Sequence, residues 1–266
     1  MIITSRTNPM IVATAALHEK KYRDERHLFL LEGIKLFREA VSSGLEIVSV
    51  FTSEKNYPLC KEMMPDGDII TVSDLVLEKL STEKAPQGII CVAKYIDKIH
   101  IINKIYSVED FLSKNHRFLI LSSVRDPGNL GTIVRTAAAF GIDELILSCD
   151  CTDIYNPKTI RGAMGTLFKQ KISYAENLYD AVMTMKRAGY NVCAAILDKD
   201  SKRLDEMEIN SKTAFIVGNE GHGIAPEIIE AASGKVYIPM EEGVESLNAA
   251  MAATVFMWQM KLSSKK

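Results

Sequence analysis

Three segments of the chain combine residue types and spacings that are typical of a chemical site. The first runs from Asp126 to Gly131 (DPGNLG) and is followed by Arg135. Pro127 and Gly128 predict a sharp turn, Asn129 is a good helix N-cap, and Arg135 falls one to two turns into the helix. Taken alone, this segment is also compatible with an ordinary turn and a surface arginine.

The second segment is a glycine loop, Gly218 to Gly223 (GNEGHG), directly after an apolar strand. Its glycines let the backbone approach a ligand closely. The order G-x-x-G-x-G differs from the dinucleotide fingerprint G-x-G-x-x-G, which disfavours a nicotinamide dehydrogenase. The Glu220 carboxylate would repel a bare phosphate, so a neutral or cationic ligand fits better. His222 is more typical of an exposed or hydrogen-bonding side chain than of a catalytic base.

The third segment joins Ile238-Pro239-Met240 to Ser246-Leu247-Asn248 through a short acidic loop. Ser246 is predicted to cap the last helix, and Asn248 would place an amide in its first turn, beside the loop. The helix that follows, to Met260, is apolar on most sides. Such a helix needs burial all round, either in the core or at a subunit interface.

Alternating strands and helices position these segments. Functional loops of open α/β sheets lie at the carboxyl ends of strands, and each of the three segments follows a predicted strand. The uninterrupted apolar strands predict a mostly parallel sheet that is covered on both faces. The expected strands are 118–124, 144–148, 191–197, 213–217 and 235–238, and the expected helices are 130–140, 177–188 and 246–261.

The first part of the chain predicts a smaller α/β unit. Its expected strands are 28–31, 47–51 and 88–93, and its expected helices are 18–26, 32–43 and 73–80. Periodicity weakens and charge rises between about Tyr95 and Lys114. We therefore expect a first domain at 1–100, a linker at 101–116 and a second domain at 117–266.

Composition restricts the class of protein. The 266 residues are 47% hydrophobic and 25% charged, as in soluble globular proteins. No apolar run reaches the roughly 18 residues of a spanning helix, and the start lacks a signal peptide, so a cytoplasmic location is expected. Five scattered cysteines without CxxC spacing argue against a disulfide framework and a metal site. Because the net charge is −2, any nucleic-acid contact must be local.

Together, and in this order, the three segments resemble the signature motifs of the SpoU (TrmH) family of RNA ribose 2′-O-methyltransferases, in the SPOUT class. The resemblance covers 117–261, and Ala249 stands where a valine is common. It implies an S-adenosylmethionine-dependent enzyme whose α/β domain holds a deep trefoil knot. It also implies a homodimer formed through the knotted domain and the C-terminal helix.

The resemblance also implies roles for individual residues. Arg135 would bind the phosphate next to the target ribose and stabilise the developing alkoxide, Asn129 and Asn248 would orient the substrate, and Glu220 would hold the catalytic loops. The implied catalytic residues are Arg135, Asn129, Glu220, Ser246 and Asn248. The implied cofactor-binding residues are Gly218, Asn219, Gly221, Ile238, Met240 and Leu247. The segment 161–165 (RGAMG) is expected to be structural.

The first part of the chain, with Arg23, Phe29, Glu32 and Gly33, is similar to a small substrate-binding domain that many family members share with kink-turn-binding ribosomal proteins. This points to ribosomal RNA, most of all to 23S RNA of the large subunit. The residues expected to bind RNA are Lys20, Lys21, Arg23, Arg26, Lys35 and Arg38.

Three alternatives share the same motifs. They are a tRNA 2′-O-methyltransferase, a ribosomal RNA methyltransferase that confers antibiotic resistance, and a non-catalytic RNA-binding factor for ribosome assembly. The complete set of catalytic residues argues against the non-catalytic factor, and titration with S-adenosylmethionine would separate it from an enzyme. The target nucleotide is not encoded in these motifs.

Overall fold

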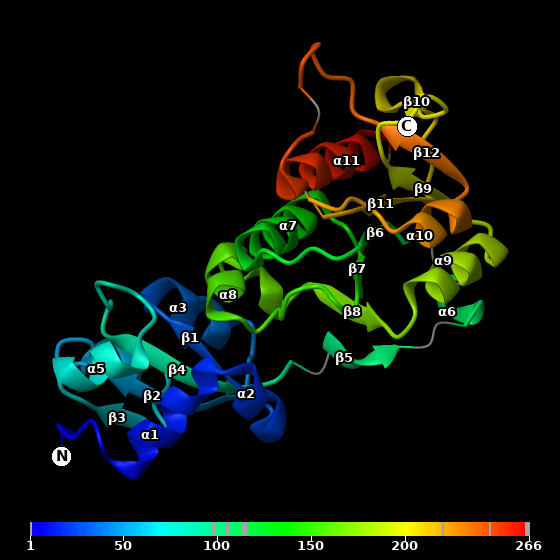
Figure 1. Cartoon of the computed structure of the whole chain (residues 1–266). Coiled ribbons are helices and arrows are strands. Elements are labelled where there is room, and N and C mark those ends of the chain that lie inside the picture. The colour runs from blue at the N-terminus through cyan, green and yellow to red at the C-terminus, as the bar shows by residue number, and fades with distance from the viewer. Residues whose placement is uncertain are drawn as a thin grey trace. The chain divides into compact units, whose positions relative to one another are not determined.

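The computed structural model describes residues 2–96, 99–104, 107–112, 116–219, 221–244 and 246–263 (Figure 1). The chain divides into two compact units. The first unit comprises residues 1–97 and 153–169, and the second comprises 98–152 and 170–266. The sequence-based division at residue 100 did not anticipate that a later segment joins the first unit.

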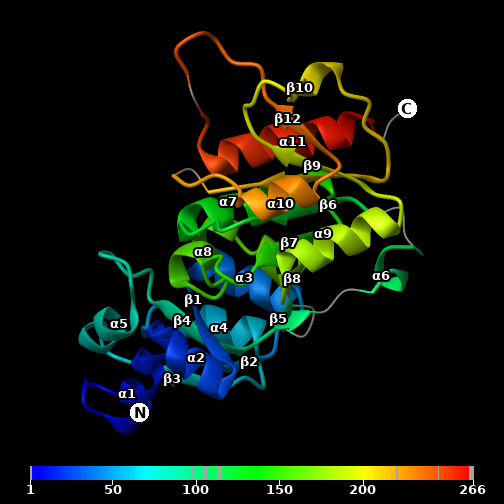
Figure 2. The ribbon, with the colours of Figure 1, turned by 45° about the vertical axis from the view of Figure 1, so that its right-hand side comes forward.

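The first unit is built on a mixed sheet, coloured blue to cyan in Figure 1 and Figure 2. Among the described residues its strand order is β1-β4-β2-β3, with β4 antiparallel to β1 and β2. The strands are β1 (Leu28–Glu32), β2 (Ile47–Thr52), β3 (Ile69–Thr71) and β4 (Ile89–Lys94). The helices are α1 (Pro9–Ala15), η1 (Ala16–His18), α2 (Lys20–Arg26), α3 (Ile34–Ser42), α4 (Tyr57–Met63), α5 (Asp74–Leu80), α8 (Pro157–Ala163) and η2 (Thr166–Phe168).

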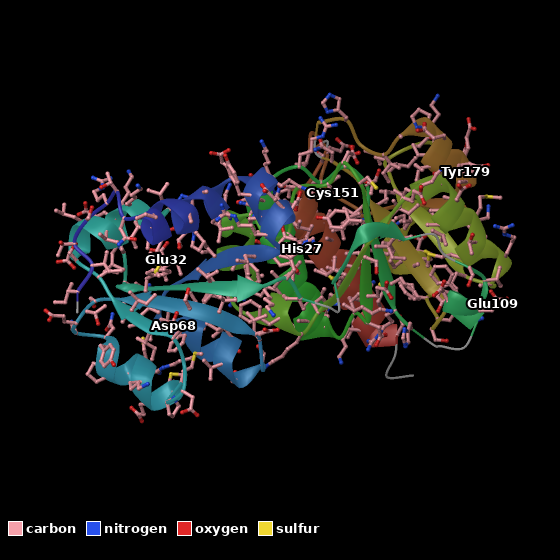
Figure 3. The ribbon with its side chains drawn as sticks, turned by 90° about the horizontal axis from the view of Figure 1, so that it is seen from below. His27, Glu32, Asp68, Glu109, Cys151 and Tyr179 are labelled. Atoms are coloured by element: carbon pink, nitrogen blue, oxygen red, sulfur yellow. The ribbon has the colours of Figure 1, made fainter. Side chains whose placement is uncertain are left out.

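Local sequence explains how this unit turns from strand to helix. Gly33, with φ of 103°, takes the chain directly from β1 into α3, and its backbone N–H donates to the Ile89 carbonyl. Glu32, labelled in Figure 3, accepts hydrogen bonds from the Ser81 hydroxyl and the Thr82 backbone N–H. Helix α3 then buries one apolar face, as its periodicity predicts.

Residues 153–169 are held to the first unit by buried polar and aromatic contacts. Asp153 pairs with Arg23 at 2.6 Å, and the Arg23 side chain is 3% exposed. Tyr155 is fully buried and stacks on Tyr95 with ring centroids 4.1 Å apart. Arg161 donates to the Thr82 hydroxyl at 2.6 Å. The segment 161–165 therefore contributes to packing in this unit.

The second unit is a parallel α/β domain. In the described part of the chain its strand order is β10-β12-β9-β11-β6-β7-β8-β5, and every pairing is parallel, which confirms the predicted sheet. The strands are β5 (Ile99–Lys104), β6 (Phe118–Leu121), β7 (Glu144–Ser148), β8 (Lys171–Ala175), β9 (Asn191–Ala195), β10 (Lys202–Arg203), β11 (Thr213–Val217) and β12 (Gly234–Tyr237). The helices are α6 (Glu109–Leu112), α7 (Pro127–Phe140), α9 (Leu178–Arg187), α10 (Pro226–Ala231), α11 (Ala249–Ser263) and η3 (Leu204–Glu206).

Helices cover both faces of this sheet, as Figure 2 shows. Ala214 and Ile216 of β11 face a core built with residues of α9 and α10. Between them, Phe215 points to the other face and packs on Phe256 of α11 at 4.8 Å. Helix α11 also packs along α7. Complete burial on both faces explains why these strands are continuous apolar runs.

Four strands of the described chain were not expected from the sequence: the short strands β3 and β10, and the edge strands β5 and β8 of the second unit. Residues 101–116 were predicted to be a linker, but β5 pairs with β8 at the sheet edge and α6 follows it. Strand β8 (KISYA) is short, and its polar residues interrupt the continuous apolar run by which a buried strand is predicted. Within the described ranges, no helix is both long and apolar enough to cross a membrane.

Candidate functional site

The three motif segments follow strands β6, β11 and β12 of one parallel sheet. Parallel strands end at the same edge, so their following loops meet there. Strand β11 lies between β9 and β6, and β12 lies on the other side of β9. The loops of the first and third segments, which are more than 100 residues apart in sequence, thereby come to the same edge of the sheet.

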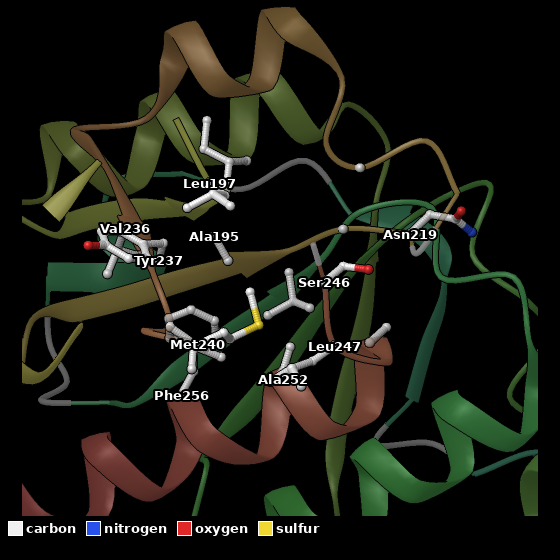
Figure 4. A pocket seen from close by; sticks show the side chains of 16 residues that line it. Ala195, Leu197, Asn219, Val236, Tyr237, Met240, Ser246, Leu247, Ala252 and Phe256 are labelled. Atoms are coloured by element: carbon white, nitrogen blue, oxygen red, sulfur yellow. The ribbon is translucent and has the colours of Figure 1, made fainter. Parts of the chain in front are cut away.

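A cavity of about 340 Å³ lies at this edge (Figure 4). Its lining combines the ends of β9, β11 and β12 with the first turns of α11, and most of the side chains are apolar. The lining residues are Ala195, Ile196, Leu197, Val217, Gly218, Asn219, Gly223, Val236, Tyr237, Ile238, Met240, Ser246, Leu247, Ala249, Ala252 and Phe256.

Most residues expected to bind the cofactor line this cavity. They are Gly218, Asn219, Ile238, Met240 and Leu247, and Ser246, which was expected to be catalytic, lies with them. Gly221 is outside the lining, and Gly223 takes its place. Glu220 lies outside the described residues.

The glycine loop folds back on itself. Asn219 N donates to Gly223 O at 3.1 Å, and Gly223 N donates to Asn219 O at 2.9 Å. A Cβ atom at Gly218 would lie 2.5 Å from Gly223 O, so no side chain fits there without moving backbone. The Asn219 side-chain oxygen accepts from Gly221 N at 2.8 Å and holds the tip of the loop. The part of the cavity wall that this loop supplies is therefore formed largely by backbone.

The helix caps differ from the sequence-based expectation. Asp126, not Asn129, is the N-cap of α7, and its carboxylate accepts from Asn129 N at 2.8 Å. Pro127 accounts for the difference, because proline favours the first helical position. At α11, Asn248 rather than Ser246 caps the helix, accepting from Ala250 N at 2.9 Å.

Asn129 and Asn248 form a direct link between the first and third motifs. The Asn248 Nδ2 group donates to Asn129 Oδ1 at 3.0 Å, across 119 positions of sequence. Neither asparagine is among the lining residues, but Asn248 directly follows the lining residues Ser246 and Leu247 in the chain and is bonded to Asn129. Arg135 is exposed on α7, and its guanidinium forms no hydrogen bond or ion pair with the residues described here.

Most basic residues expected to bind RNA are exposed on α2 and α3, namely Lys20, Lys21, Arg26, Lys35 and Arg38. Arg23 is the exception. Besides Asp153, its guanidinium donates to the carbonyls of Leu17 and His18 at 2.8 and 2.7 Å. Because a buried and fully engaged guanidinium cannot contact phosphate, the prediction for Arg23 is wrong.

Sequence inspection missed several lining residues, among them Leu197, Tyr237 and Phe256. The signal for the first two was present, because both lie at or just beyond the carboxyl end of a strand. Phe256 had no such signal, since its role depends on which face of α11 meets β11. Groups of three or more potential metal ligands are absent from the described residues.

Comparisons with known proteins agree with this geometry. Residues 116–258 match the model of the SpoU rRNA Methylase family, and residues 8–91 match the MRM3-like substrate binding domain. The chain is 29% identical over 260 residues to the 23S rRNA (guanosine(2553)-2'-O)-methyltransferase RlmP of Bacillus subtilis, covering 97% of this chain and 98% of that protein. It is 28% identical to the mitochondrial rRNA methyltransferase 3A of Danio rerio, covering 95% of this chain and 68% of that protein.

Among solved structures, the AdoMet-bound rRNA methyltransferase from Sinorhizobium meliloti superposes with a TM-score of 0.84 at 28% identity, covering 98% and 97% of the two chains. An RNA 2'-O ribose methyltransferase superposes with a TM-score of 0.83 at 27% identity over the whole of both chains. The chain therefore belongs to the SpoU rRNA methylase family and is an S-adenosylmethionine-dependent RNA methyltransferase.

Proposed function

We propose that the enzyme methylates a ribose 2′-hydroxyl in 23S ribosomal RNA of the large subunit. The observation that carries this proposal is the convergence of the cavity and the Asn129–Asn248 pair at one sheet edge. The Bacillus subtilis relative, which acts on 23S rRNA by its name, aligns along almost the whole of this chain.

The cavity fits S-adenosylmethionine. Apolar side chains suit the adenine ring, and the backbone of the glycine loop, which has no room for a Cβ at Gly218, supplies polar groups close to the ligand. Gly218, Asn219, Ile238, Met240 and Leu247 would hold the molecule, with Gly221 supporting the loop from outside the lining. When bound, S-adenosylmethionine supplies an electrophilic methyl group on a sulfonium centre.

The chain's own residues then orient and activate the ribose. Arg135 binds the phosphate next to the target nucleotide and stabilises the oxygen as it loses its proton. Since a guanidinium stays protonated, Arg135 acts electrostatically and the proton passes to the substrate phosphate. Asn129, Asn248 and Ser246 orient substrate groups, and Glu220 holds the loops.

A complementation experiment tests the target and Arg135 together. Ribose methylations in ribosomal and transfer RNA are mapped in cells with and without the gene. We expect one 23S position to lose its methyl group, wild-type protein to restore it, and Arg135→Ala not to restore it although its Kd for S-adenosylmethionine stays near wild type. The matched control is Arg187→Ala, because Arg187 lies on α9, which covers the opposite face of the sheet from α7. Loss of a tRNA methylation instead, or substantial turnover by Arg135→Ala, would contradict the proposal.

The first unit is proposed to grip the RNA, with a fold like that of kink-turn-binding ribosomal proteins. Its match to a substrate binding domain supports this role. Lys20, Lys21, Arg26, Lys35 and Arg38 supply the exposed charge. Arg23 is not included, because it is buried.

A knotted, homodimeric form in the cytoplasm completes the proposal. Family membership supports the deep trefoil knot of the second unit. Exposed apolar side chains on α11, Met251, Trp258 and Leu262, support a dimer, and the Trp258 ring lies 5.4 Å from that of Phe140 on α7. The bacterial 23S rRNA relative supports a cytoplasmic location.

A further inference from the structure

The carboxyl end of β7 carries a polar network that the motifs do not include. The Asp150 carboxylate accepts from the hydroxyls of Ser123 and Ser148, each at 2.6 Å. The Ser148 oxygen in turn accepts from Ser123 N at 2.8 Å. Arg125 approaches the same carboxylate at 3.5 Å. The network thus holds the turn between β6 and α7 from two sides.

Ser123 has an unfavourable backbone conformation. Its φ is 58°, and in the described chain only two other non-glycine residues, His27 and Met164, also have a positive φ. An L-residue with a side chain pays a free-energy penalty in this left-handed region, so surrounding contacts must hold it there. The two bonds from Ser123, through its hydroxyl to Asp150 and its N–H to Ser148, are the contacts that do so.

The conformation of Ser123 matters because its carbonyl reaches the glycine loop. Asn219 Nδ2 donates to Ser123 O at 3.0 Å, while the same side chain holds Gly221 N and lines the cavity. Along the chain, Ser123 is followed after Arg125 by Asp126, and Asp126 caps the helix that carries Asn129 and Arg135. One residue therefore connects the cavity wall to the catalytic helix.

We propose that Asp150 is a positioning residue for methyl transfer, which keeps Ser123 left-handed so that its carbonyl anchors Asn219 and the glycine loop. For the RNA step this rests on the proposed function, whereas its effect on S-adenosylmethionine binding does not. Partial burial raises the pKa of Asp150, but the hydrogen bonds from Ser123, Ser148 and Arg125 outweigh burial and hold that pKa below the ordinary value of an aspartate. The carboxylate is therefore ionised at neutral pH, where it accepts all three bonds.

A glycine substitution at Ser123 separates positioning from general stabilisation. Glycine adopts the left-handed conformation without penalty, so it removes the need for Asp150. We expect Asp150→Ala to weaken S-adenosylmethionine binding about tenfold by calorimetry and to lower kcat, the tenfold corresponding to about 1.4 kcal/mol. Ser123→Gly should stay within about twofold of wild type, and Asp150→Ala with Ser123→Gly should return to within about threefold.

Two further variants test whether the loss of another charged side chain near Asp150 has the same effect on binding. Glu176→Ala removes an exposed carboxylate just after the neighbouring strand β8 and should leave the Kd unchanged. Arg125→Ala removes only the longest of the three bonds to Asp150, at 3.5 Å, so it should weaken binding less than Asp150→Ala does. If Asp150→Ala does not fold, Asp150→Asn replaces it in the same comparison.

The outcomes are distinguishable. Wild-type affinity in Asp150→Ala, or a double variant as weak as Asp150→Ala, would overturn the positioning role. If wild-type protein binds S-adenosylmethionine but methylates no 23S RNA, the proposed target fails while the Kd comparison still decides the role of Asp150.

Discussion

Individual arginines of this chain serve opposite purposes that residue type alone does not separate. Arg23 lies in a charged helical segment beside Lys20 and Lys21, yet it is buried and paired with Asp153, 130 positions away. Arg135, in contrast, lies exposed on α7, a helix in which most of the other residues are apolar. The position of the partner carboxylate decides which arginine is structural and which is available to a ligand.

This difference predicts distinct phenotypes for two variants of the first unit. Arg23→Met leaves Asp153 without its cation, so the free energy of unfolding should fall by about 3–5 kcal/mol. Removing Lys35 and Arg38 together should cost little stability but reduce the salt dependence of RNA binding by about one to two units of slope. Urea unfolding and binding at several salt concentrations measure the two effects. A reduced slope in folded Arg23→Met would show that this residue contacts RNA after all.

At the level of elements, the site depends on the junction of α7 with α11. The Asn248 side chain uses its oxygen to cap α11 and its Nδ2 group to reach Asn129. A single amide thus performs one task for the stability of the helix and another for the alignment of two motifs. An aspartate could perform only the first task, because a carboxylate accepts but does not donate.

Two substitutions at Asn248 separate these tasks. Asn248→Ala loses the cap, so the free energy of unfolding should fall by about 1 kcal/mol, and activity should fall with it. Asn248→Asp keeps the cap and should unfold like wild type while its kcat falls at least about tenfold. Urea unfolding and single-turnover methyl transfer provide the two measurements. Equal activity of Asn248→Asp and wild type would mean that the link to Asn129 is not needed.

At the scale of the whole molecule, helix α11 is apolar on most sides and yet remains partly exposed. Its inner side packs on β11 and α7, while Trp258 remains 49% exposed. Such a surface is consistent with the proposed homodimer, which would complete the burial.

A charge in this surface tests the dimer. Trp258→Asp should raise the dimer dissociation constant by at least about 30-fold, the effect of removing a 2 kcal/mol interface residue. Sedimentation velocity at several concentrations measures the shift. The matched control is Tyr179→Asp, which changes an exposed aromatic residue on α9 and should sediment like wild type. An unchanged dimer in Trp258→Asp would place the interface elsewhere.

The amino-acid sequence by itself determined the α/β class, most strands of the parallel sheet and the three loops that carry the motifs. These features follow from local information, because apolar runs, glycines and prolines act within a few residues. It did not reveal β5 and β8, whose short or weakly apolar segments become strands by pairing in the sheet, where β8 lies between β7 and β5.

Tertiary structure alone decided which polar groups meet. Asp126 took the cap predicted for Asn129, which left Asn129 to contact Asn248, and Asp153 took Arg23 out of reach of RNA. The connection from Asp150 through Ser123 to Asn219 likewise joins three strand ends that are distant in sequence. Sequence patterns report the neighbours of a residue along the chain, whereas hydrogen bonds and ion pairs depend on neighbours in space, which exist only after the sheet has formed.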